Sequence, residues 1–185
     1  MKKAMTLCMM LLAAGAFAQT KTMEKTVTVG GQPMLPSQNI IQNAVNSGDH
    51  TTLVAAVTAA DLVATLSGAG PFTVFAPVND AFENLPAGTV ETLLKPENKA
   101  QLTAVLTYHV LSGKYDFAAL AAEIKKGKGT AKLQTVQSGW LTFTMNGEHN
   151  ITLIDEKGNS ANISVYDVYQ SNGVIHVIDS VVLPK

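Results

Sequence analysis

The sequence predicts an α+β domain, because the spacing of its apolar residues changes along the chain. Between residues 40 and 66 apolar side chains recur at helical spacing, and beyond Gly129 their spacing falls to two. Strands and helices do not alternate strictly. A helix-rich first half followed by a strand-rich, mostly antiparallel second half is the pattern of an α+β fold.

Residues 1–18 have the three-part build of a secretory signal peptide. Lys2 and Lys3 precede an apolar run, and a small-x-small cleavage site ends at Ala18. The apolar run is well below the ~20 residues that cross a bilayer. Cleavage leaves 185 − 18 = 167 residues, the size of one domain. The only cysteine, Cys8, lies in the signal, so we expect no disulfide and no thiol catalyst in the exported chain.

Residues 19–36 are polar and Thr-rich without an apolar period, so we expect a flexible tether. We expect residues 37–185 to form a single folded domain. Its first helix follows Ser37 as a candidate cap and stops at Ser47 and Gly48. Further helical patterns run through residues 53–57 and 62–66, and glycines with a proline end them at residues 68–71.

Residues 72–76 form a short apolar run that predicts a buried strand ending at Pro77. Asn79 or Asp80 can cap the helix that carries Ala81 and Phe82. The other helices are expected at residues 81–85, 90–94 and 99–108, and from Asp116 onwards. The strands are expected at residues 133–136, 141–145, 151–154, 163–166 and 174–182, with turns at Asn146–Gly147, residues 155–159 and Asn172–Gly173.

The charge of the chain argues against nucleic acid and nucleotide partners. The net charge of −1 becomes −3 once Lys2 and Lys3 are removed, and all thirteen basic residues are lysines. The chain therefore lacks the guanidinium fork that reads bases or clamps phosphate. The densest positive cluster consists of Lys125, Lys126, Lys128 and Lys132. It has two interpretations: a solubilising loop, or a patch for a polyanion such as an acidic polysaccharide, for which Lys125, Lys126 and Lys128 are the candidate contacts.

The histidines and carboxylates do not form a catalytic or metal-binding motif. His109 and His176 lie among apolar residues and are expected to be buried and hydrogen-bonded, whereas His50 and His149 lie in polar turns and are expected to be exposed. Asp155 and Glu156 are expected to be solvated in their turn. No cofactor, metal or catalytic residue is predicted.

Three segments in fixed order carry a family resemblance. Residues 73–82 and 172–184 resemble the paired signatures of the fasciclin (FAS1) family, and residues 106–113 are similar to its tyrosine-histidine motif. The resemblance covers about residues 37–185. It implies a wedge-shaped β-sandwich with helices packed along it and both signatures in its central strands. The residues that it assigns to this structural motif are Thr73, Phe75, Pro77, Asn79, Phe82, Tyr108, His109, Asn172, Gly173, His176 and Asp179.

The resemblance also implies a function, since fasciclin domains serve mainly as extracellular adhesion modules. Asp167 and Val168 stand where integrin-binding members of the family carry an Asp-Ile pair. We therefore expect a secreted, periplasmic or cell-surface module that binds an extracellular protein or polysaccharide without catalysis. We expect no stable membrane insertion after signal cleavage. The alternative is a small extracellular hydrolase acting on surface glycans or esters, and the sequence leaves the oligomeric state open.

Overall fold

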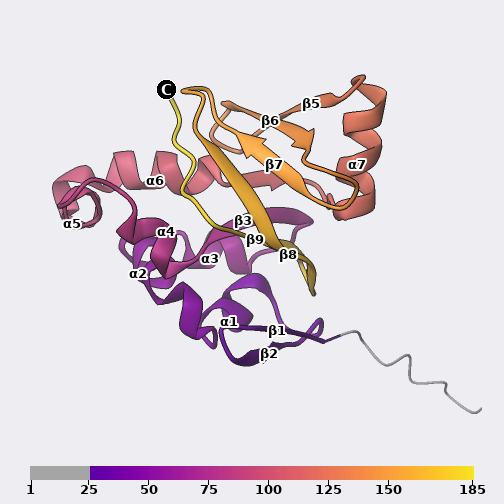
Figure 1. Ribbon diagram of the computed structural model, residues 1–185. Helices are drawn as coiled ribbons and strands as arrows, with labels where there is room; N and C mark the ends of the chain where they lie inside the picture. The colour runs from indigo at the N-terminus through magenta and orange to yellow at the C-terminus, as the bar shows by residue number, and fades with distance from the viewer. Residues whose placement is uncertain (1–25) are drawn as a thin grey trace, which may run out of the picture.

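The computed structural model describes residues 26–185, so the predicted signal peptide, Cys8 and residues 19–25 lie outside the described residues. Figure 1 shows helices on one side of the central strands β3 and β9, and strands β5–β7 with helix α7 on the other. The helices are α1 (Ile40–Ala44), α2 (Thr51–Ala59), α3 (Val63–Ser67), α4 (Asn79–Glu83), α5 (Thr89–Leu93), α6 (Lys99–Tyr108) and α7 (Phe117–Lys126), with the 3-10 turns η1 (Gly48–His50) and η2 (Pro96–Asn98). The strands are β1 (Val27–Val29), β2 (Gln32–Met34), β3 (Phe72–Pro77), β4 (Val110–Ser112), β5 (Thr130–Gln134), β6 (Trp140–Met145), β7 (Ile151–Ile154), β8 (Ser160–Gln170) and β9 (Gly173–Ile178).

The principal sheet has seven strands in the order β4-β3-β9-β8-β7-β6-β5. Only the β3–β9 pair is parallel, and the other neighbours are antiparallel, as the sequence predicts. The two edges of the sheet approach each other, because Leu111 forms a bridge with Thr135 and the Val136 amide donates to the Val110 carbonyl at 2.8 Å. The sheet is therefore nearly closed.

Strand β8 links the two halves of this sheet. Its first residues pair with β7 and its last residues pair with β9, and two irregularities interrupt the register between Ile163 and Val168. A bulge bends a strand and increases its twist, so a single long strand can serve two differently oriented parts of a sheet.

The core lies on both faces of β3 and β9. Val74 and Val177 pack into a cluster with the N-terminal helices, whereas Phe75 and Ile178 pack into a second cluster with α7 and the other strands. Side chains alternate across a strand, so a strand between two clusters must be apolar at nearly every position. Both strands match this requirement, since all six residues of β9 and the last five of β3 are buried.

The tether prediction is wrong for residues 27–34, which form an antiparallel hairpin. Val29 and Met34 are buried in the cluster that Val74 and Val177 form with the N-terminal helices, which we call the helix-side cluster, and they anchor this hairpin. Gly30 and Gly31 have φ of +58° and +77°, the left-handed conformations that a two-residue hairpin turn requires. Each short strand has only one buried apolar residue, so no sustained period was visible in the sequence.

Two further differences concern the ends of elements, and a third is a short strand. The cap of α1 is Asn39, which forms a reciprocal capping box with Gln42, and not Ser37. Strand β9 ends at Ile178, although the apolar pattern continued to residue 182. Strand β4 was not expected, because a strand of three residues is too short to display a period.

Candidate functional site

The two signature segments lie side by side at the centre of the sheet. Phe72 pairs with Gly173 and Phe75 with His176 in the parallel β3–β9 register. A β-carbon at position 173 would clash with the carbonyl oxygen of Phe72, so this close approach requires glycine. The resemblance placed both signatures in central strands, and the structure agrees.

Asn172 connects the second signature to two helices. Its Oδ1 accepts from the Ile40 amide at 3.0 Å, at the start of α1. Its Nδ2 donates to the carbonyl oxygens of Leu66 and Gly68, both at 2.9 Å, where α3 ends. One side chain thus satisfies groups at two helix ends that have no partner within their helices.

Asn79 caps a different helix from the one predicted. Its Oδ1 accepts from the Thr52 amide at 3.1 Å and from Thr51 Oγ1 at 3.2 Å, and its Nδ2 donates to the Gly48 carbonyl at 2.9 Å. Thr51 and Thr52 begin α2, and Gly48 begins the 3-10 turn η1 just before it. Its own helix α4 has Val78 at the N-cap and no side-chain cap.

The tyrosine-histidine motif joins α6 to the strands and to the C-terminal segment. Tyr108 is fully buried, and its hydroxyl donates to the Trp140 carbonyl at 2.8 Å and accepts from the Glu156 amide at 3.2 Å. Burial raises the pKa of Tyr108 to about 12. His109 Nδ1 donates to the Val105 carbonyl at 2.8 Å, and its Nε2 accepts from the Val182 amide at 3.3 Å. Burial lowers the pKa of His109 to about 4, so this histidine is neutral at pH 7.

His176 is also buried with both ring nitrogens in use. Its Nε2 donates to the Tyr115 carbonyl at 2.8 Å, and its Nδ1 accepts from the Asp167 amide at 3.4 Å. Burial lowers the pKa of His176. Nearby Thr73 donates to the Gly113 carbonyl and accepts from the Tyr115 amide, both at 2.8 Å. The burial expected of His109 and His176 is therefore confirmed, and neither ring presents a free nitrogen.

The remaining motif residues also make contacts within the domain. Phe75 is fully buried, Pro77 is the buried last residue of β3, and Phe82 is half-buried on α4. Asp179 is exposed and accepts from the amide and the side chain of Asn162, at 2.8 and 3.0 Å. These two hydrogen bonds fix the chain where it leaves β9.

Two predictions of exposure are wrong. His50 is buried, its Nδ1 lies 2.8 Å from Ser47 Oγ, and burial lowers the pKa of His50. Asp155 is also buried, because its carboxylate accepts from the amides of Lys157, Asn159 and Leu183 and from the Asn159 side chain. A carboxylate that receives several donors can be buried without a counter-ion. His149 is exposed as predicted.

Asp167 and Val168 do not form a surface patch together. Val168 is 1% exposed and belongs to the helix-side cluster, so the prediction that it contacts a partner is wrong. Asp167 is half-buried with φ of +58°, within the irregular part of β8. Its Oδ1 accepts from the Phe117 amide at 2.7 Å, at the start of α7, so Asp167 positions this helix.

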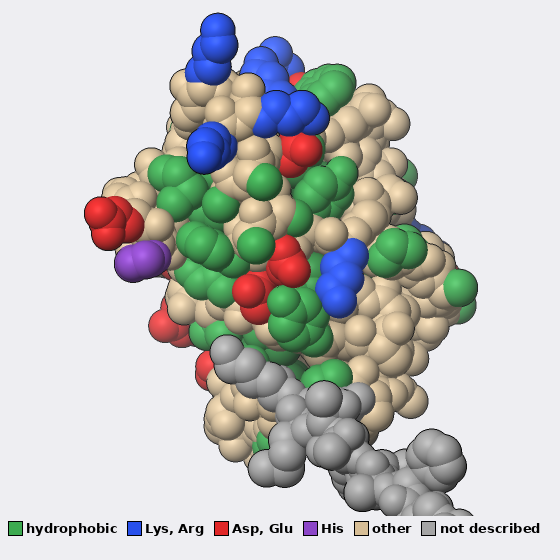
Figure 2. Space-filling model, turned by 90° about the vertical axis from the view of Figure 1, so that its right-hand side faces the viewer, with side chains coloured by type: hydrophobic (Ala, Val, Ile, Leu, Met, Phe, Trp, Pro, Cys, Tyr) green, Lys and Arg blue, Asp and Glu red, His purple; other side chains and the backbone are tan. Residues whose placement is uncertain are grey.

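The lysine cluster does lie on the surface. Lys125 and Lys126 occupy the last turn of α7, and Lys128 follows with φ of +57°. Figure 2 shows lysine side chains gathered at one end of the face that carries α7. Lys126 Nζ lies 3.3 Å from Glu123 Oε2. Cations at the C-terminus of a helix also interact favourably with its dipole, so these lysines have a structural explanation as well.

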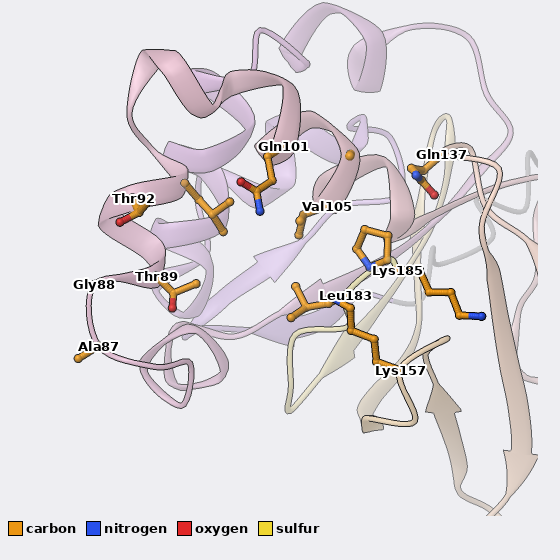
Figure 3. A pocket seen from close by; sticks show the side chains of 13 residues that line it. Ala87, Gly88, Thr89, Thr92, Gln101, Val105, Gln137, Lys157, Leu183 and Lys185 are labelled. Atoms are coloured by element: carbon orange, nitrogen blue, oxygen red, sulfur yellow. The ribbon is translucent and has the colours of Figure 1, made fainter.

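A hollow of about 510 Å³ lies between α5, α6 and the C-terminal segment, and we call it the α5–α6 hollow. Leu93, Val105 and Leu183 contribute apolar surface, and Thr89, Thr92, Gln101 and Gln137 contribute neutral polar groups. Figure 3 shows the two threonines on one side and Lys157 and Lys185 on the other. Among the described residues that line the hollow, these two lysines are the only ones with a titratable side chain. Its hydroxyl groups therefore have no histidine or carboxylate beside them to act as a base.

A sequence profile of the Fasciclin domain matches residues 48–184. The chain belongs to the fasciclin family. It is 46% identical over 169 residues to protein sll1483 of Synechocystis, a match that covers 91% of this chain and 86% of that protein. It is 36% identical over 146 residues to immunogenic protein MPB70 of Mycobacterium bovis, covering 76% of this chain and 66% of the relative.

A solved structure shows the same fold. The FAS1 domain pair of the insect cell adhesion molecule fasciclin I superposes with a TM-score of 0.69 at 18% identity, covering 79% of this chain and 51% of that one. The FAS1-like fold expected from the resemblance is thereby confirmed.

Within residues 26–185, no helix combines the length and apolar character needed to cross a membrane. The same residues contain no group of three or more histidine, cysteine or acidic side chains placed to hold a metal ion.

Proposed function

We propose that this fasciclin domain is an exported, non-catalytic module that binds an extracellular protein or polysaccharide. Fasciclin domains are known from cell-adhesion and surface proteins. The proposal rests on one observation, the positions of the histidines and of the polar groups that line the α5–α6 hollow. The histidines with shifted pKa values are fixed inside the fold, and the α5–α6 hollow combines apolar surface with hydrogen-bonding groups but is lined by no histidine or acidic residue among those that the structure describes.

This distribution disfavours the hydrolase alternative. Hydrolysis of an ester or a glycan needs a base or paired carboxylates that converge on the substrate. His109 and His176 use both ring nitrogens in the core, and Asp155 uses its carboxylate to hold a turn and the C-terminal segment. None of these three residues lines the α5–α6 hollow. Asp155 does line a second hollow with Glu156, but both of its carboxylate oxygens already accept hydrogen bonds from within the domain.

The surface offers two regions for a ligand. The lysine cluster of α7 would attract a polyanion, and its contribution would be screened by salt. The C-terminal region with the α5–α6 hollow would instead take a ligand that fills a concave surface. Both are compatible with an extracellular partner.

An array of extracellular proteins and polysaccharides tests the proposal when it is combined with a panel of ester and glycosidic substrates. We expect saturable binding to at least one array member and no turnover. Turnover that persists through repeated purification and disappears in His109→Gln would contradict the proposal. Intact-mass measurement of the exported protein tests its location, because retention of residues 1–18 would contradict export through the predicted signal.

A further inference from the structure

Trp140 is an exposed aromatic residue on a rigid strand. It is the only tryptophan of the chain, it begins β6, and 44% of its surface is exposed. Within residues 26–185 its indole has no hydrogen-bond partner and no aromatic neighbour, although its backbone carbonyl holds the Tyr108 hydroxyl. The backbone is thus fixed, and the side chain belongs to none of the core clusters of residues 26–185.

The strand register places polar side chains around this indole. Gln134 lies opposite Trp140 and Lys132 lies opposite Thr142, so these four side chains share one face of β5 and β6. We call it the outer β5–β6 face. Leu141 and Phe143 point the other way and are fully buried, so the core residues of β6 lie on the opposite face.

A hollow of about 250 Å³ lies beside Trp140, and we call it the Trp140 hollow. Among the described residues, the side chains of Lys132, Glu156 and Lys185 form no ion pair. Lys185 also lines the α5–α6 hollow, as does Lys157, the neighbour of Glu156, so the two hollows adjoin. The full lining of the Trp140 hollow is Lys132, Trp140, Thr142, Asp155, Glu156 and Lys185.

We propose that the Trp140 hollow binds a pyranose ring of a neutral polysaccharide, with further rings in the α5–α6 hollow. This inference rests on the proposed binding function and names its ligand class. One face of a pyranose carries C–H groups that pack against an aromatic ring, and an exposed indole offers a broad apolar surface with one donor. The ring hydroxyls both donate and accept hydrogen bonds, which matches the ammonium, hydroxyl and carboxylate groups of the lining.

The local charge favours a neutral ligand over a polyanion. Two lysines and two acidic residues line the hollow, so their charges nearly cancel. A polyanion would gain more at the lysine cluster of α7, where Glu123 is the only acidic partner that the structure pairs with these lysines.

The volume of the Trp140 hollow bears on the size of the ligand. Sites for whole small molecules usually measure about 300–1,000 Å³, so the Trp140 hollow suits one ring and the adjoining hollow lengthens the site.

Because Trp140 is the only tryptophan, its emission reports directly on this site. We would titrate the purified protein with cellohexaose and mannohexaose as neutral probes and with hexagalacturonate as an acidic probe of equal length. A neutral probe is expected to shift the emission to shorter wavelength and to saturate, with little change between low and high salt.

Calorimetric titration of two variants at Trp140 completes the test. Trp140→Ala should bind about two- to tenfold more weakly, because a stacking contribution of about 0.5–1.5 kcal/mol corresponds to that range, and Trp140→Phe should keep part of the affinity.

A triple variant, Lys125→Gln, Lys126→Gln and Lys128→Gln, is the matched control and should bind the neutral probe as the parent does. Steeply salt-dependent binding of hexagalacturonate that is lost in the triple variant and kept in Trp140→Ala would overturn the inference in favour of the lysine cluster. Binding of a protein ligand without any oligosaccharide would overturn it while leaving the proposed function intact. Failure of every protein and glycan ligand would overturn both.

Discussion

The central strands β3 and β9 differ from the outer β5–β6 face in how they use polar groups. In the central strands and the turn that precedes β9, Thr73, His176 and Asn172 each direct their side-chain hydrogen bonds to backbone groups of other segments. On the outer face, Lys132 and Trp140 direct their side chains to a hollow and make no such bond. The segments that resemble the family signatures therefore build the fold, and the proposed binding site lies on a face that the signatures do not include.

The largest expected effect concerns the protonation of the buried histidines. The folded pKa of His109 is lowered to about 4 from the ordinary value of 6.5, so the folded state resists protonation. Its contribution to stability is fully present above pH 6.5 and is lost as the pH falls towards 4, by about 3 kcal/mol. Lowered pKa values of His50 and His176 act in the same direction. Urea unfolding at pH 7 and at pH 4 measures this loss.

Histidine variants separate this effect from the titration of carboxylates. His109→Gln should be less stable than the parent at pH 7 but lose less stability on acidification, whereas exposed His149→Gln should behave as the parent does. An unchanged pH dependence in His109→Gln would contradict the assignment.

The next effect is the loss of a side chain that holds two helices. Asn172→Ala removes one accepted and two donated hydrogen bonds at the ends of α1 and α3, and should lower the free energy of unfolding by about 2–3 kcal/mol. Exposed Asn46 makes a single bond to the Gln42 carbonyl and serves as the control. Asn46→Ala should cost about 0.5 kcal/mol or less. Equal losses in the two variants would mean that the Asn172 bonds are not important for stability.

The same threonine-to-valine substitution, made once in β3 and once on the outer β5–β6 face, compares the two regions directly. Thr73→Val keeps the shape of the side chain but leaves the Gly113 carbonyl and the Tyr115 amide without their partner, at a cost of about 1–2 kcal/mol. Thr142→Val on the outer β5–β6 face removes a hydroxyl that holds no backbone group, and should change stability by less than about 0.5 kcal/mol. Calorimetric unfolding of the two variants measures the difference, and the reverse order would break the comparison.

The effect expected at Trp140 is smaller than those at His109, Asn172 and Thr73. Its partly exposed indole is not part of any core cluster within residues 26–185, so Trp140→Ala should alter the free energy of unfolding by less than about 1 kcal/mol. Chemical unfolding monitored by circular dichroism measures it without relying on tryptophan emission. A large loss would place Trp140 with the residues that build the fold.

The sequence predicted the strands β3, β6 and β7 and the helices α6 and α7 well because their apolar periods are long or unbroken. Burial that depends on distant partners was harder to foresee. His50 and Asp155 lie in polar turns, and only the folded chain brings Ser47 to the first and the Leu183 amide to the second. The hairpin at residues 27–34 was missed because each strand has a single buried apolar residue.

The candidate site was mostly not predicted, although part of its signal was present. Alternation through Leu141 and Phe143 already implies that Trp140 faces outwards with Thr142. The sequence could not show that Glu156 and Lys185 line the same hollow as Trp140 of β6, because they come from a turn and from the C-terminal end of the chain. The pairing of Asp167 with Val168 suggested a contact surface, but an irregular strand buries Val168.

A glycan array probed in parallel with the parent, Trp140→Ala and the lysine triple variant tests the central claim most directly. The account predicts that neutral polysaccharides bind the parent and the triple variant alike, and that Trp140→Ala loses them while remaining folded. An array profile that is unchanged in Trp140→Ala, or that disappears only in the triple variant, would contradict the claim that recognition lies at the outer β5–β6 face.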